Sequence, residues 1–451
     1  MSERARFYKE RDRRTQEYSP AQEACFERPV TFCVASDAAD SPRGQLTAAA
    51  ALNMVVRIHR RVCLVCPDKP LLVPEALIPV QPAKHARLRD ALVAMAAAID
   101  PYITIDTAAP HEVDVGIAIG GDAAVAVPWY IGSEDGLVKL DTKPLRIDDK
   151  EGFSLGACLA SCVAAASLFK LVVDRPVIPL CVSAWNMKEG ADAEGGPSRF
   201  GPVDVGSVAM VGAGGVGGSL AYWLRQNGIR GEWRVIDGDC AELHNTNRSL
   251  DMVAADAGWP NLMPRPKAIV AAEQFGAVPQ NLWFDQLDQE AFRPDLVLPL
   301  ANERAVRNAV SQRGEPLLLH ATTSPTWEAQ LHRHIPDRDD CIMCRMPPSG
   351  GTVQLACSAV RVGGEGMPTD AALPFLSASA GFLVMNGLHR LMSGDLSRGD
   401  CNLWRLLYNS PRAFIRSAKC KCQTDCVGIP SRSIRSRVNA GRRWACLDSG
   451  S

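Results

Sequence analysis

The feature that most constrains the fold is a glycine-rich turn between an apolar strand and a helix. The apolar run at 208–211 is followed at once by Gly212-Ala-Gly214-Gly-Val-Gly217, and helical spacing begins directly after it. Glycines at these positions allow a tight turn and let backbone N–H groups approach a phosphate at the positive end of a helix. This context predicts a nucleotide-binding α/β domain in the second half of the chain.

Strands and helices alternate through both halves of the chain. In the first half, residues 30–40 are predicted to form a strand and a turn, residues 44–61 a helix, and residues 113–121 another buried strand. This alternation predicts an α/β fold made of two doubly wound, Rossmann-like domains with parallel sheets. The first strand-to-helix turn contains only one glycine at its helix start, so this half is expected to be a degenerate, catalytically silent copy.

The predicted boundaries follow from composition. Residues 1–186 form the degenerate domain, and 187–207, rich in Gly, Pro and acidic residues, form a linker. Residues 208–427 form the active domain. The basic segment 428–451 is short of core residues and is expected to be a flexible tail, or else a contact to an acidic partner.

Charge and hydropathy exclude several classes of function. The 451 residues contain 49 Lys and Arg against 50 Asp and Glu, so no overall basic field exists to hold nucleic acid or an anionic membrane. The N-terminus alternates charges and lacks the apolar core of a signal peptide, and no run is long enough to span a bilayer. The expected location is the cytoplasm, without nucleic-acid or membrane partners.

A dense polar run follows the next strand of the second half. It contains Asp237, Asp239, Asn245 and Arg248, and Lys267 begins the following helix. Asp237 is placed to accept hydrogen bonds from a ribose. The cations suit adenylate formation, in which negative charge grows on the phosphates. An NAD-dependent oxidoreductase needs no such cluster but stays open as an alternative, as does a solvated turn before a capped helix.

These residues match a known family. The stretch from 208 to 249 resembles the phosphate loop, ribose aspartate and Asn-x-x-Arg segment of the ThiF/MoeB-type adenylyltransferases and ubiquitin-activating enzymes, and the similarity extends over roughly 200–427. The resemblance implies that ATP is bound, with Asp237 at the ribose, Asn245 and Arg248 at the phosphates, and Lys267 reaching them from the next helix. The gap between Arg248 and Lys267 is longer than is usual in the family.

One position departs from the family pattern. The family places a magnesium-binding aspartate where this chain has Asn302, and a neutral amide is a weaker ligand for a hard cation. Either Mg²⁺ is held mostly by the ATP phosphates with help from Glu303, or adenylation is impaired. Asn302 can also be read as a helix cap.

Sixteen cysteines in a large chain without a leader are read as thiols, metal ligands or nucleophiles. Two short-spaced groups near the C-terminus predict a tetrahedral zinc site that joins distant segments, with free thiols as the alternative. The expected ligands are Cys341, Cys344, Cys422 and Cys426, with Cys420 in reserve. The family commonly carries such a structural zinc here.

Cys357 is a single cysteine in a glycine-bearing segment before an apolar helix. In related enzymes this segment crosses over the adenylate site and can carry a nucleophile. A thiolate there would attack the acyl-adenylate and keep the activated carboxylate as a thioester. The alternative is a buried thiol in a strand.

The resemblance implies ATP-dependent adenylation of the C-terminal glycine of a ubiquitin-like protein, followed by thioester formation and transfer to a conjugating enzyme. Paired inactive and active halves resemble ubiquitin-activating enzymes. Simpler relatives are homodimers in which an N-terminal arginine reaches the other unit's ATP, a part open to Arg11, Arg13 or Arg14. The alternatives are a sulfur-carrier-protein adenylyltransferase and a non-catalytic scaffold that binds a ubiquitin-like protein.

Overall fold

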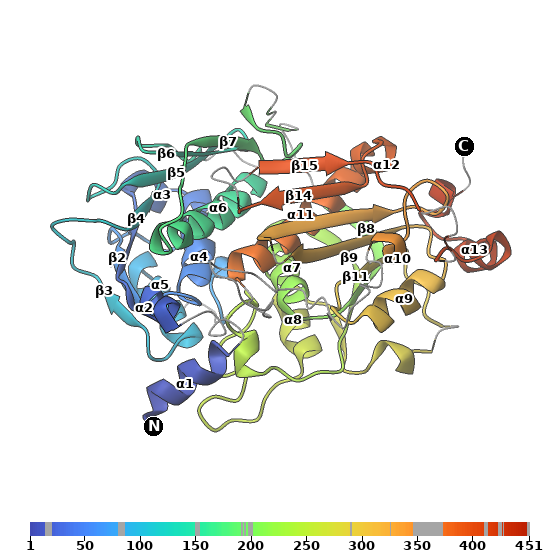
Figure 1. The fold of residues 1–451 in the computed structure, drawn as a ribbon, viewed down its shortest axis with the longest axis horizontal. Coiled ribbons are helices and arrows are strands. Elements are labelled where there is room, and N and C mark those ends of the chain that lie inside the picture. The colour runs from blue at the N-terminus through green and yellow to red at the C-terminus, as the bar shows by residue number, and fades with distance from the viewer. Residues whose placement is uncertain are drawn as a thin grey trace.

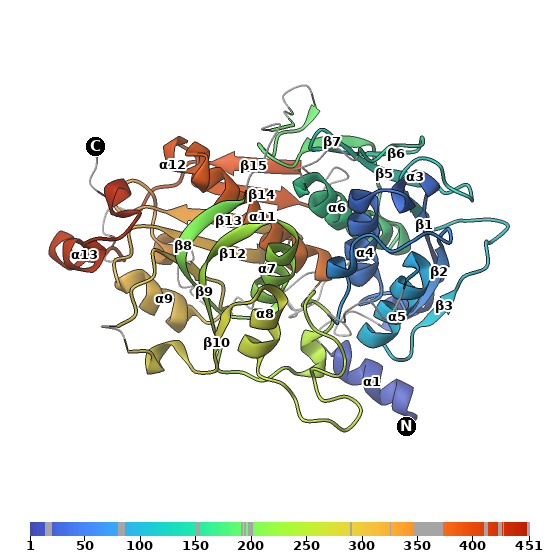
Figure 2. The ribbon, with the colours of Figure 1, turned by 180° about the vertical axis from the view of Figure 1, so that it is seen from behind.

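The computed structural model describes residues 1–13, 20–79, 86–148, 154–190, 193, 195–196, 202–288, 291–324, 326–345, 373–409, 414–422, 426 and 428–448. Each half of the chain builds its own sheet, and the two halves lie side by side (Figure 1). Helix α1 (Glu3–Arg11) and helix α13 (Arg432–Asn439) lie at opposite ends of the molecule (Figure 2).

The first half contains a mixed sheet whose described strands run in the order β3-β2-β1-β4-β5-β6-β7. Neighbours from β3 to β5 are parallel, and the last two pairs are antiparallel. The elements are α1 (Glu3–Arg11), α2 (Pro20–Glu27), β1 (Val30–Val34), α3 (Ser36–Ala39), α4 (Pro42–Val55), β2 (Arg61–Val65), η1 (Pro74–Ala76), α5 (Leu88–Ile99), β3 (Thr104–Asp106), β4 (Gly116–Ile119), β5 (Trp129–Glu134), β6 (Leu137–Asp141), α6 (Leu155–Val172) and β7 (Leu180–Ser183).

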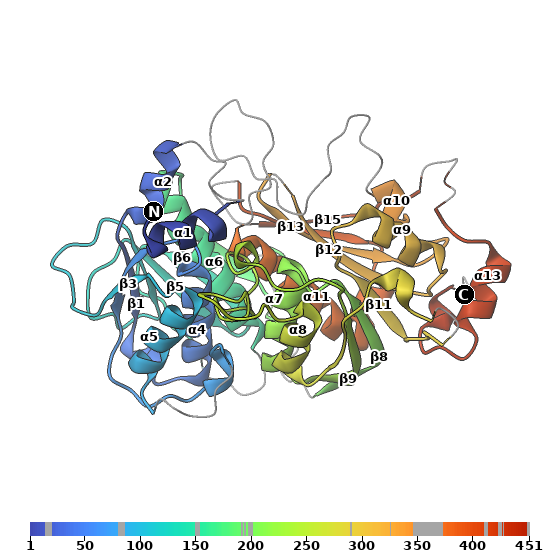
Figure 3. The same cartoon turned by 90° about the horizontal axis from the view of Figure 1, so that it is seen from below.

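The second half repeats this topology with one more strand among its described residues, in the order β10-β9-β8-β11-β12-β13-β14-β15. Its elements are β8 (Val203–Val211), α7 (Gly215–Gln226), β9 (Ile229–Ile236), η3 (Leu243–Asn245), α8 (Lys267–Phe275), β10 (Val278–Gln280), η4 (Phe284–Gln286), β11 (Leu296–Pro299), α9 (Arg304–Gln312), β12 (Leu318–Ser324), β13 (Glu328–His334), α10 (Ile342–Arg345), α11 (Pro374–Met392), α12 (Asp395–Arg398), β14 (Leu403–Leu407), β15 (Phe414–Ala418), α13 (Arg432–Asn439) and η5 (Ala445–Asp448). Figure 3 shows α9 and α10 on one side of this sheet and α7, α8 and α11 on the other.

The two parallel-rich sheets fit the predicted Rossmann-like architecture, but the expectation of fully parallel sheets is wrong. Both sheets end in antiparallel strands, from β5 to β7 and from β12 to β15. In the first sheet the reversal occurs at Asp135 and Gly136, which have φ values of 51° and 78°. An Asp-Gly pair with positive φ at both residues forms the tight turn that matches the twist of a hairpin. This dipeptide in the sequence was the available signal for the reversal.

The first half lacks a phosphate-binding turn for a visible reason. Helix α3 directly follows β1, where the second half has its glycine-rich turn. The Asp37 carboxylate accepts hydrogen bonds from the N–H groups of Gly121 and Asp122 at 3.1 Å. A carboxylate held at this edge of the sheet repels a phosphate group, which is consistent with a degenerate half.

The two halves share one continuous hydrophobic core, in which α6 packs on α11. Phe169 on α6 lies 5.7 Å from the ring of Phe375 and 5.4 Å from the ring of Trp327, both from the second half. Helix α6 is long and apolar enough to span a membrane by length and composition, so the expectation that no run has this length is wrong. However, 94% of that stretch is buried inside the protein. A helix that is apolar on all faces is expected in such a core.

Parts of two segments predicted to be irregular form regular structure among the described residues. Strand β8 begins at Val203, so the last residues of the expected linker 187–207 belong to the second sheet. In the expected tail, Arg435 pairs with Asp337 at 2.6 Å and Arg442 pairs with the buried Glu315. The prediction of a flexible tail over 428–451 is therefore wrong for its described part, because these arginines are the partners of carboxylates on the domain.

A buried arginine joins the halves next to the predicted nucleotide loop. Arg57, just after α4, is 1% exposed, and its guanidinium donates to the carbonyl oxygens of Thr246, Leu250 and Met252. Its Nε donates to Asn53 at 2.8 Å. Burial lowers the pKa of Arg57 to about 9. The first half thereby fixes the backbone that follows Asn245.

Replacing Arg57 with Ala is expected to lower the free energy of unfolding by roughly 3–5 kcal/mol, because the buried carbonyl groups lose their donor. Urea unfolding of the full chain measures this loss. The exposed Arg61 on β2 gives a control, since Arg61→Ala is expected to change stability by no more than about 0.5 kcal/mol. Equal stability of Arg57→Ala and wild type would contradict the role of this clamp.

Candidate nucleotide site and cysteine site

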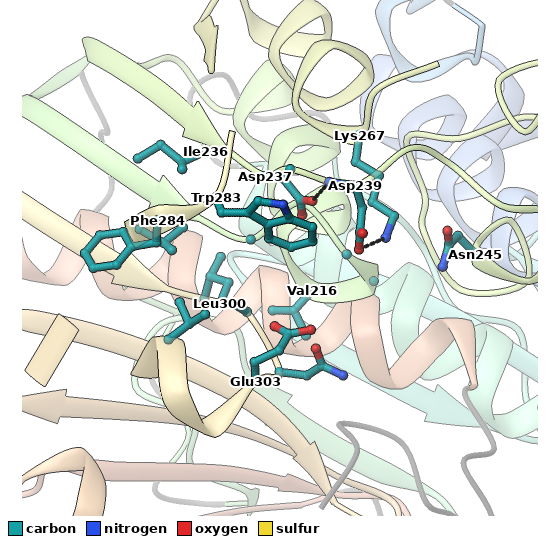
Figure 4. Close-up of a pocket in the computed structure, with 18 of the residues that line it drawn as sticks. Val216, Ile236, Asp237, Asp239, Asn245, Lys267, Trp283, Phe284, Leu300 and Glu303 are labelled. Carbon is teal, nitrogen blue, oxygen red and sulfur yellow. Dashed lines mark hydrogen bonds and ion pairs between the residues drawn. The ribbon is translucent and has the colours of Figure 1, made fainter. Parts of the chain in front are cut away.

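An open cavity lies where β8, β9 and β11 end, at the start of α7 (Figure 4). Including its mouth it measures about 1040 Å³. Of the residues predicted from sequence to bind the nucleotide, all but one line it, namely Gly212, Gly214, Asp237, Asp239, Asn245, Arg248, Lys267 and Asn302. The exception is Gly217. The carboxyl ends of parallel strands are where ligands bind in open α/β sheets.

The three glycines of the turn have different roles. Gly212 has a φ of 102°, and a Cβ there would lie 2.4 Å from the backbone nitrogen of Ala301. Gly214 is the N-cap of α7 and makes no side-chain capping bond, so the first N–H groups of α7 open onto the cavity. Gly217 does not line the cavity. It faces the turn instead, since a Cβ there would lie 2.1 Å from the carbonyl oxygen of Gly212. It allows α7 to pack against the turn.

Asp237 and Asp239 fix the polar side of the cavity. The Asp237 carboxylate accepts hydrogen bonds from the N–H of Ala213 at 2.7 Å and from the N–H of Asp239 at 2.9 Å, which ties the glycine turn to the end of β9. Burial raises the pKa of Asp237, an effect that the positive charge of Lys267 opposes. Lys267 is buried and pairs with Asp239 at 2.7 Å. Despite the long gap in sequence, Lys267 therefore lies at the site.

Arg248 reaches the cavity across the start of α7. A Cβ at Gly215 would lie 3.2 Å from Cδ of Arg248, so the side chain packs against this glycine. Its guanidinium donates to the carbonyl oxygen of His244 at 2.8 Å. Asn245 accepts a hydrogen bond from the N–H of Glu242 at 2.9 Å, which shapes the turn that leads to Arg248. The cations at 248 and 267 thus flank the helix start.

Sequence reasoning missed the apolar side of the cavity. Trp283, Phe284, Leu300, Ile236 and Val216 line it, and Trp283 is 47% exposed. A Cβ at residue 238 would lie 2.6 Å from the Trp283 ring, so Gly238 is required for the indole to lie against the backbone. Two adjacent aromatic residues directly after β10, at the same edge of the sheet, were the available signal. An exposed aromatic face beside apolar side chains suits a flat base.

Asn302 and Glu303 are both exposed and line the cavity. Glu303 lies opposite Trp283 and Asp237 (Figure 4). The N-cap of α9 is Glu303, without a side-chain capping bond. The alternative that Asn302 caps this helix is therefore wrong. Amide and carboxylate oxygens of this kind fit a hard cation such as Mg²⁺.

The three N-terminal arginines differ in placement. Arg11 is fully buried and pairs with Asp12 at 2.7 Å and with Asp100 at 2.6 Å, so it is structural. Arg13 lies 2.9 Å from Nδ1 of His244 and 3.4 Å from Glu242, two residues that line the cavity of the same chain. Arg14 lies outside the described residues.

The cysteines chosen from sequence come together. The sulfur atoms of Cys341, Cys344, Cys422 and Cys426 lie within 4.8 Å of one another. Sγ of Cys422 accepts a hydrogen bond from the N–H of Cys341 at 3.1 Å, and Sγ of Cys426 accepts one from the N–H of Gly428 at 3.3 Å.

Four sulfur ligands of this kind fit a structural zinc ion. The backbone of Cys420 instead makes two hydrogen bonds with the side chain of Asn402, accepting from its Nδ2 and donating to its Oδ1. Cys357, the predicted nucleophile, lies outside the described residues.

Cys344→Ser is expected to lower the zinc content of the purified chain, because it removes one of four thiolate ligands. Elemental analysis by mass spectrometry measures the metal per chain. Cys420→Ser is the matched control, since Cys420 is near in sequence but not among the clustered sulfur atoms. An equal loss of zinc from both variants would contradict the assignment of the ligands.

A buried carboxyl group lies behind the phosphate loop. Asp251 is 2% exposed, and a Cβ at Gly218 of α7 would lie 2.2 Å from its Oδ1. Neither carboxyl oxygen has a hydrogen-bond partner among the described residues. Burial, with help from the nearby Asp256, raises the pKa of Asp251 to about 7, against the attraction of Arg57.

Since the folded pKa of Asp251 lies above the ordinary 3.8, the folded chain holds this proton more tightly than the unfolded chain. Its contribution to stability is therefore present at low pH and declines as pH rises from about 4 to about 7. We expect Asp251→Asn to gain stability relative to wild type between pH 5 and pH 8, measured by urea unfolding at both values. A pH-independent difference would contradict the raised pKa.

Comparison with known proteins gives distant similarity. No protein-family model matches the chain. A curated relative, the Uncharacterized protein y4jF of Sinorhizobium fredii, is 26% identical over 347 residues, which cover 72% of this chain and 62% of the relative. The chain therefore matches less than two thirds of that protein's length.

Solved structures of MccB from E. coli are also similar. The structure of MccB alone is 16% identical with a TM-score of 0.36, and the alignment covers 50% of this chain and 65% of that chain. The structure with ATP is 16% identical with a TM-score of 0.37, covering 49% and 65%. At these values the similarity supports no statement about activity.

Proposed function

We propose that the second half of this chain binds ATP and uses it to adenylate a terminal carboxylate, as a member of the ThiF/MoeB-type superfamily. The observation that carries this proposal is the cavity at the start of α7, where an open helix end, the cations Arg248 and Lys267 and an apolar side with Trp283 meet. A helix start with uncapped N–H groups binds phosphate, and a flat base fits against the indole.

In this reaction a carboxylate oxygen attacks the α-phosphorus, the bond to the leaving pyrophosphate breaks, and an acyl-adenylate forms. Negative charge grows on the phosphate oxygens, and Arg248 and Lys267 are placed to stabilise it. Asp237 orders the glycine turn through its hydrogen bond to Ala213 and keeps oxygen lone pairs for the ribose hydroxyl groups. Asn302 and Glu303 would hold Mg²⁺, which neutralises phosphate charge when bound.

Arg13 adds a third cation at the rim of the cavity, and it comes from the first half of the same chain. This supports a division of labour in which the degenerate half completes the site of the active half. It also removes the need for a second copy to supply this arginine, although a homodimer stays a prediction.

The substrate we propose is the C-terminal glycine of a ubiquitin-like protein. The repeated strand order of the two halves supports a paired inactive and active arrangement like that of ubiquitin-activating enzymes. Thioester formation on Cys357 and transfer to a conjugating enzyme rest on the sequence resemblance alone. A sulfur-carrier protein as the adenylated substrate is the nearest alternative.

Two further alternatives make different demands on the site. An NAD-dependent oxidoreductase also uses a glycine-rich turn with an aspartate after the next strand, but it needs no cations around the phosphates. The argument for a non-catalytic scaffold is that Asn302 stands where the family has a magnesium-binding aspartate. Glu303 beside it keeps a carboxylate at the cavity, which favours the enzyme.

Arg248→Ala is expected to lose most of the exchange of labelled pyrophosphate into ATP, because one charge stabiliser of this type contributes about 2.7–4 kcal/mol to the barrier. The assay contains the full chain, Mg²⁺, ATP and candidate small proteins with a free C-terminal glycine. Arg230→Ala is the control, since Arg230 is exposed on β9 away from the cavity.

Direct binding separates the alternatives without a protein substrate. ATP is expected to quench the fluorescence of Trp283, and Trp283→Leu should remove that change. Quenching by NADH but not by ATP would favour the oxidoreductase. The scaffold would be favoured if ATP binds but none of the small proteins with a C-terminal glycine supports the exchange of pyrophosphate into ATP.

A further inference from the structure

Three histidines gather on one face of the second sheet, away from the nucleotide cavity and next to the four-cysteine cluster. His320 lies on β12, and His332 and His334 lie two residues apart on β13. The antiparallel register pairs His320 with His332 directly and Leu318 with His334. Because side chains alternate along a strand, all three imidazoles project from the same face. They are 0%, 1% and 4% exposed, respectively.

The three rings are close enough to share one ligand. The His320 and His332 ring centres lie 5.1 Å apart, and each lies 6.0 Å from that of His334. Each ring offers one nitrogen, and these three nitrogen atoms lie within 4.8 Å of one another. Histidine is the commonest metal ligand in proteins, and three imidazoles from a rigid sheet form a typical site with one open position.

Most of these nitrogen atoms lack hydrogen-bond partners. Among the residues that the structure describes, neither ring nitrogen of His320 or His332 has a partner, and neither does Nε2 of His334. A buried polar atom without a partner costs on the order of 1–3 kcal/mol. Several such atoms at one point require an explanation, and a shared metal ion would provide it.

The exception is informative. Nδ1 of His334 lies 2.6 Å from the carbonyl oxygen of Asp340, to which it donates. This bond fixes the tautomer that leaves a lone pair on Nε2. Metal-binding histidines are usually oriented by such a bond, in which the ring nitrogen that does not bind the metal donates to a carbonyl or carboxylate oxygen.

Burial is the main reason that the three imidazoles are neutral. Burial lowers the pKa of His320 and of His332 well below its usual range, and Arg307 and Arg345 act in the same direction. Neutral imidazole is the form that binds metal. Arg345 is paired with Asp340 at 2.9 Å, which offsets its repulsion of a cation.

We propose that His320, His332 and His334 bind a divalent transition-metal ion in a site separate from the four-cysteine cluster. The chemistry of three nitrogen donors fits zinc and its neighbours in the first transition row, and does not fit Mg²⁺ or Ca²⁺. The ion would join β12 to β13 and remove the cost of the unpartnered nitrogen atoms.

The test measures metal per chain in the full-length protein after saturation with Zn²⁺ and desalting, with an affinity tag that lacks histidine. We expect about two ions in wild type and about one in His332→Gln, since each removed ligand weakens its own site. Cys344→Ser should also lose about one ion, and the double variant about two. His59→Gln is the matched control, because His59 is also fully buried but is not part of the cluster.

A second readout guards against misfolding of the variants. Cobalt(II) added to metal-free Cys344→Ser should give visible d–d absorption without a strong thiolate-to-metal charge-transfer band. His320→Gln in this background should abolish that absorption, whereas His59→Gln should keep it. The proposal is overturned if wild type saturates at one ion that Cys344→Ser removes, or if His332→Gln binds as much metal as wild type.

Discussion

The buried guanidinium of Arg57 is the interaction on which the site depends most. It belongs to the first half, yet its hydrogen bonds end on Thr246, Leu250 and Met252 of the second half. The segment it holds begins directly after Asn245 and includes Arg248. A charged group with no exposure is tolerated only when its donors are satisfied, so the loop and the arginine stabilise each other. The first half therefore supports the candidate nucleotide site.

The two halves share a hydrophobic core because each contributes an apolar helix that must be kept from water. Helices α6 and α11 occupy equivalent places in the two repeats, because α6 lies between β6 and β7 in the chain and α11 lies between β13 and β14. The two helices pack on each other. Each is apolar on nearly all faces and could not remain exposed to water. Helix α1 adds a further contact, since Phe7 stacks edge-on against Trp259 at 5.2 Å. Through this contact Arg13 comes to the rim of the cavity.

The C-terminal region contains two clusters of side chains at one end of the second sheet, the four cysteines and the three histidines. The cysteines join α10 to the strand end after β15, and Gly428 is required there because a Cβ would lie 2.4 Å from Sγ of Cys341. The histidines lie on β12 and β13 nearby, and His334 and Cys341 line one small cavity. Arg435 on α13 and Arg442, just after that helix, complete this region by pairing with Asp337 and Glu315.

The sequence by itself determined the glycine turn, the residues of the polar run and the two short-spaced groups of cysteines, because these depend on local spacing and on residue chemistry. It also determined the alternation of strands and helices. Only the tertiary structure decided which side chains meet across long separations. Trp283 reaches the cavity because Gly238 leaves room, Arg13 because α1 docks on Trp259, and His320 faces His332 because β12 and β13 pair in that register. Strand register and docking are set by packing over the whole molecule, which no local pattern encodes.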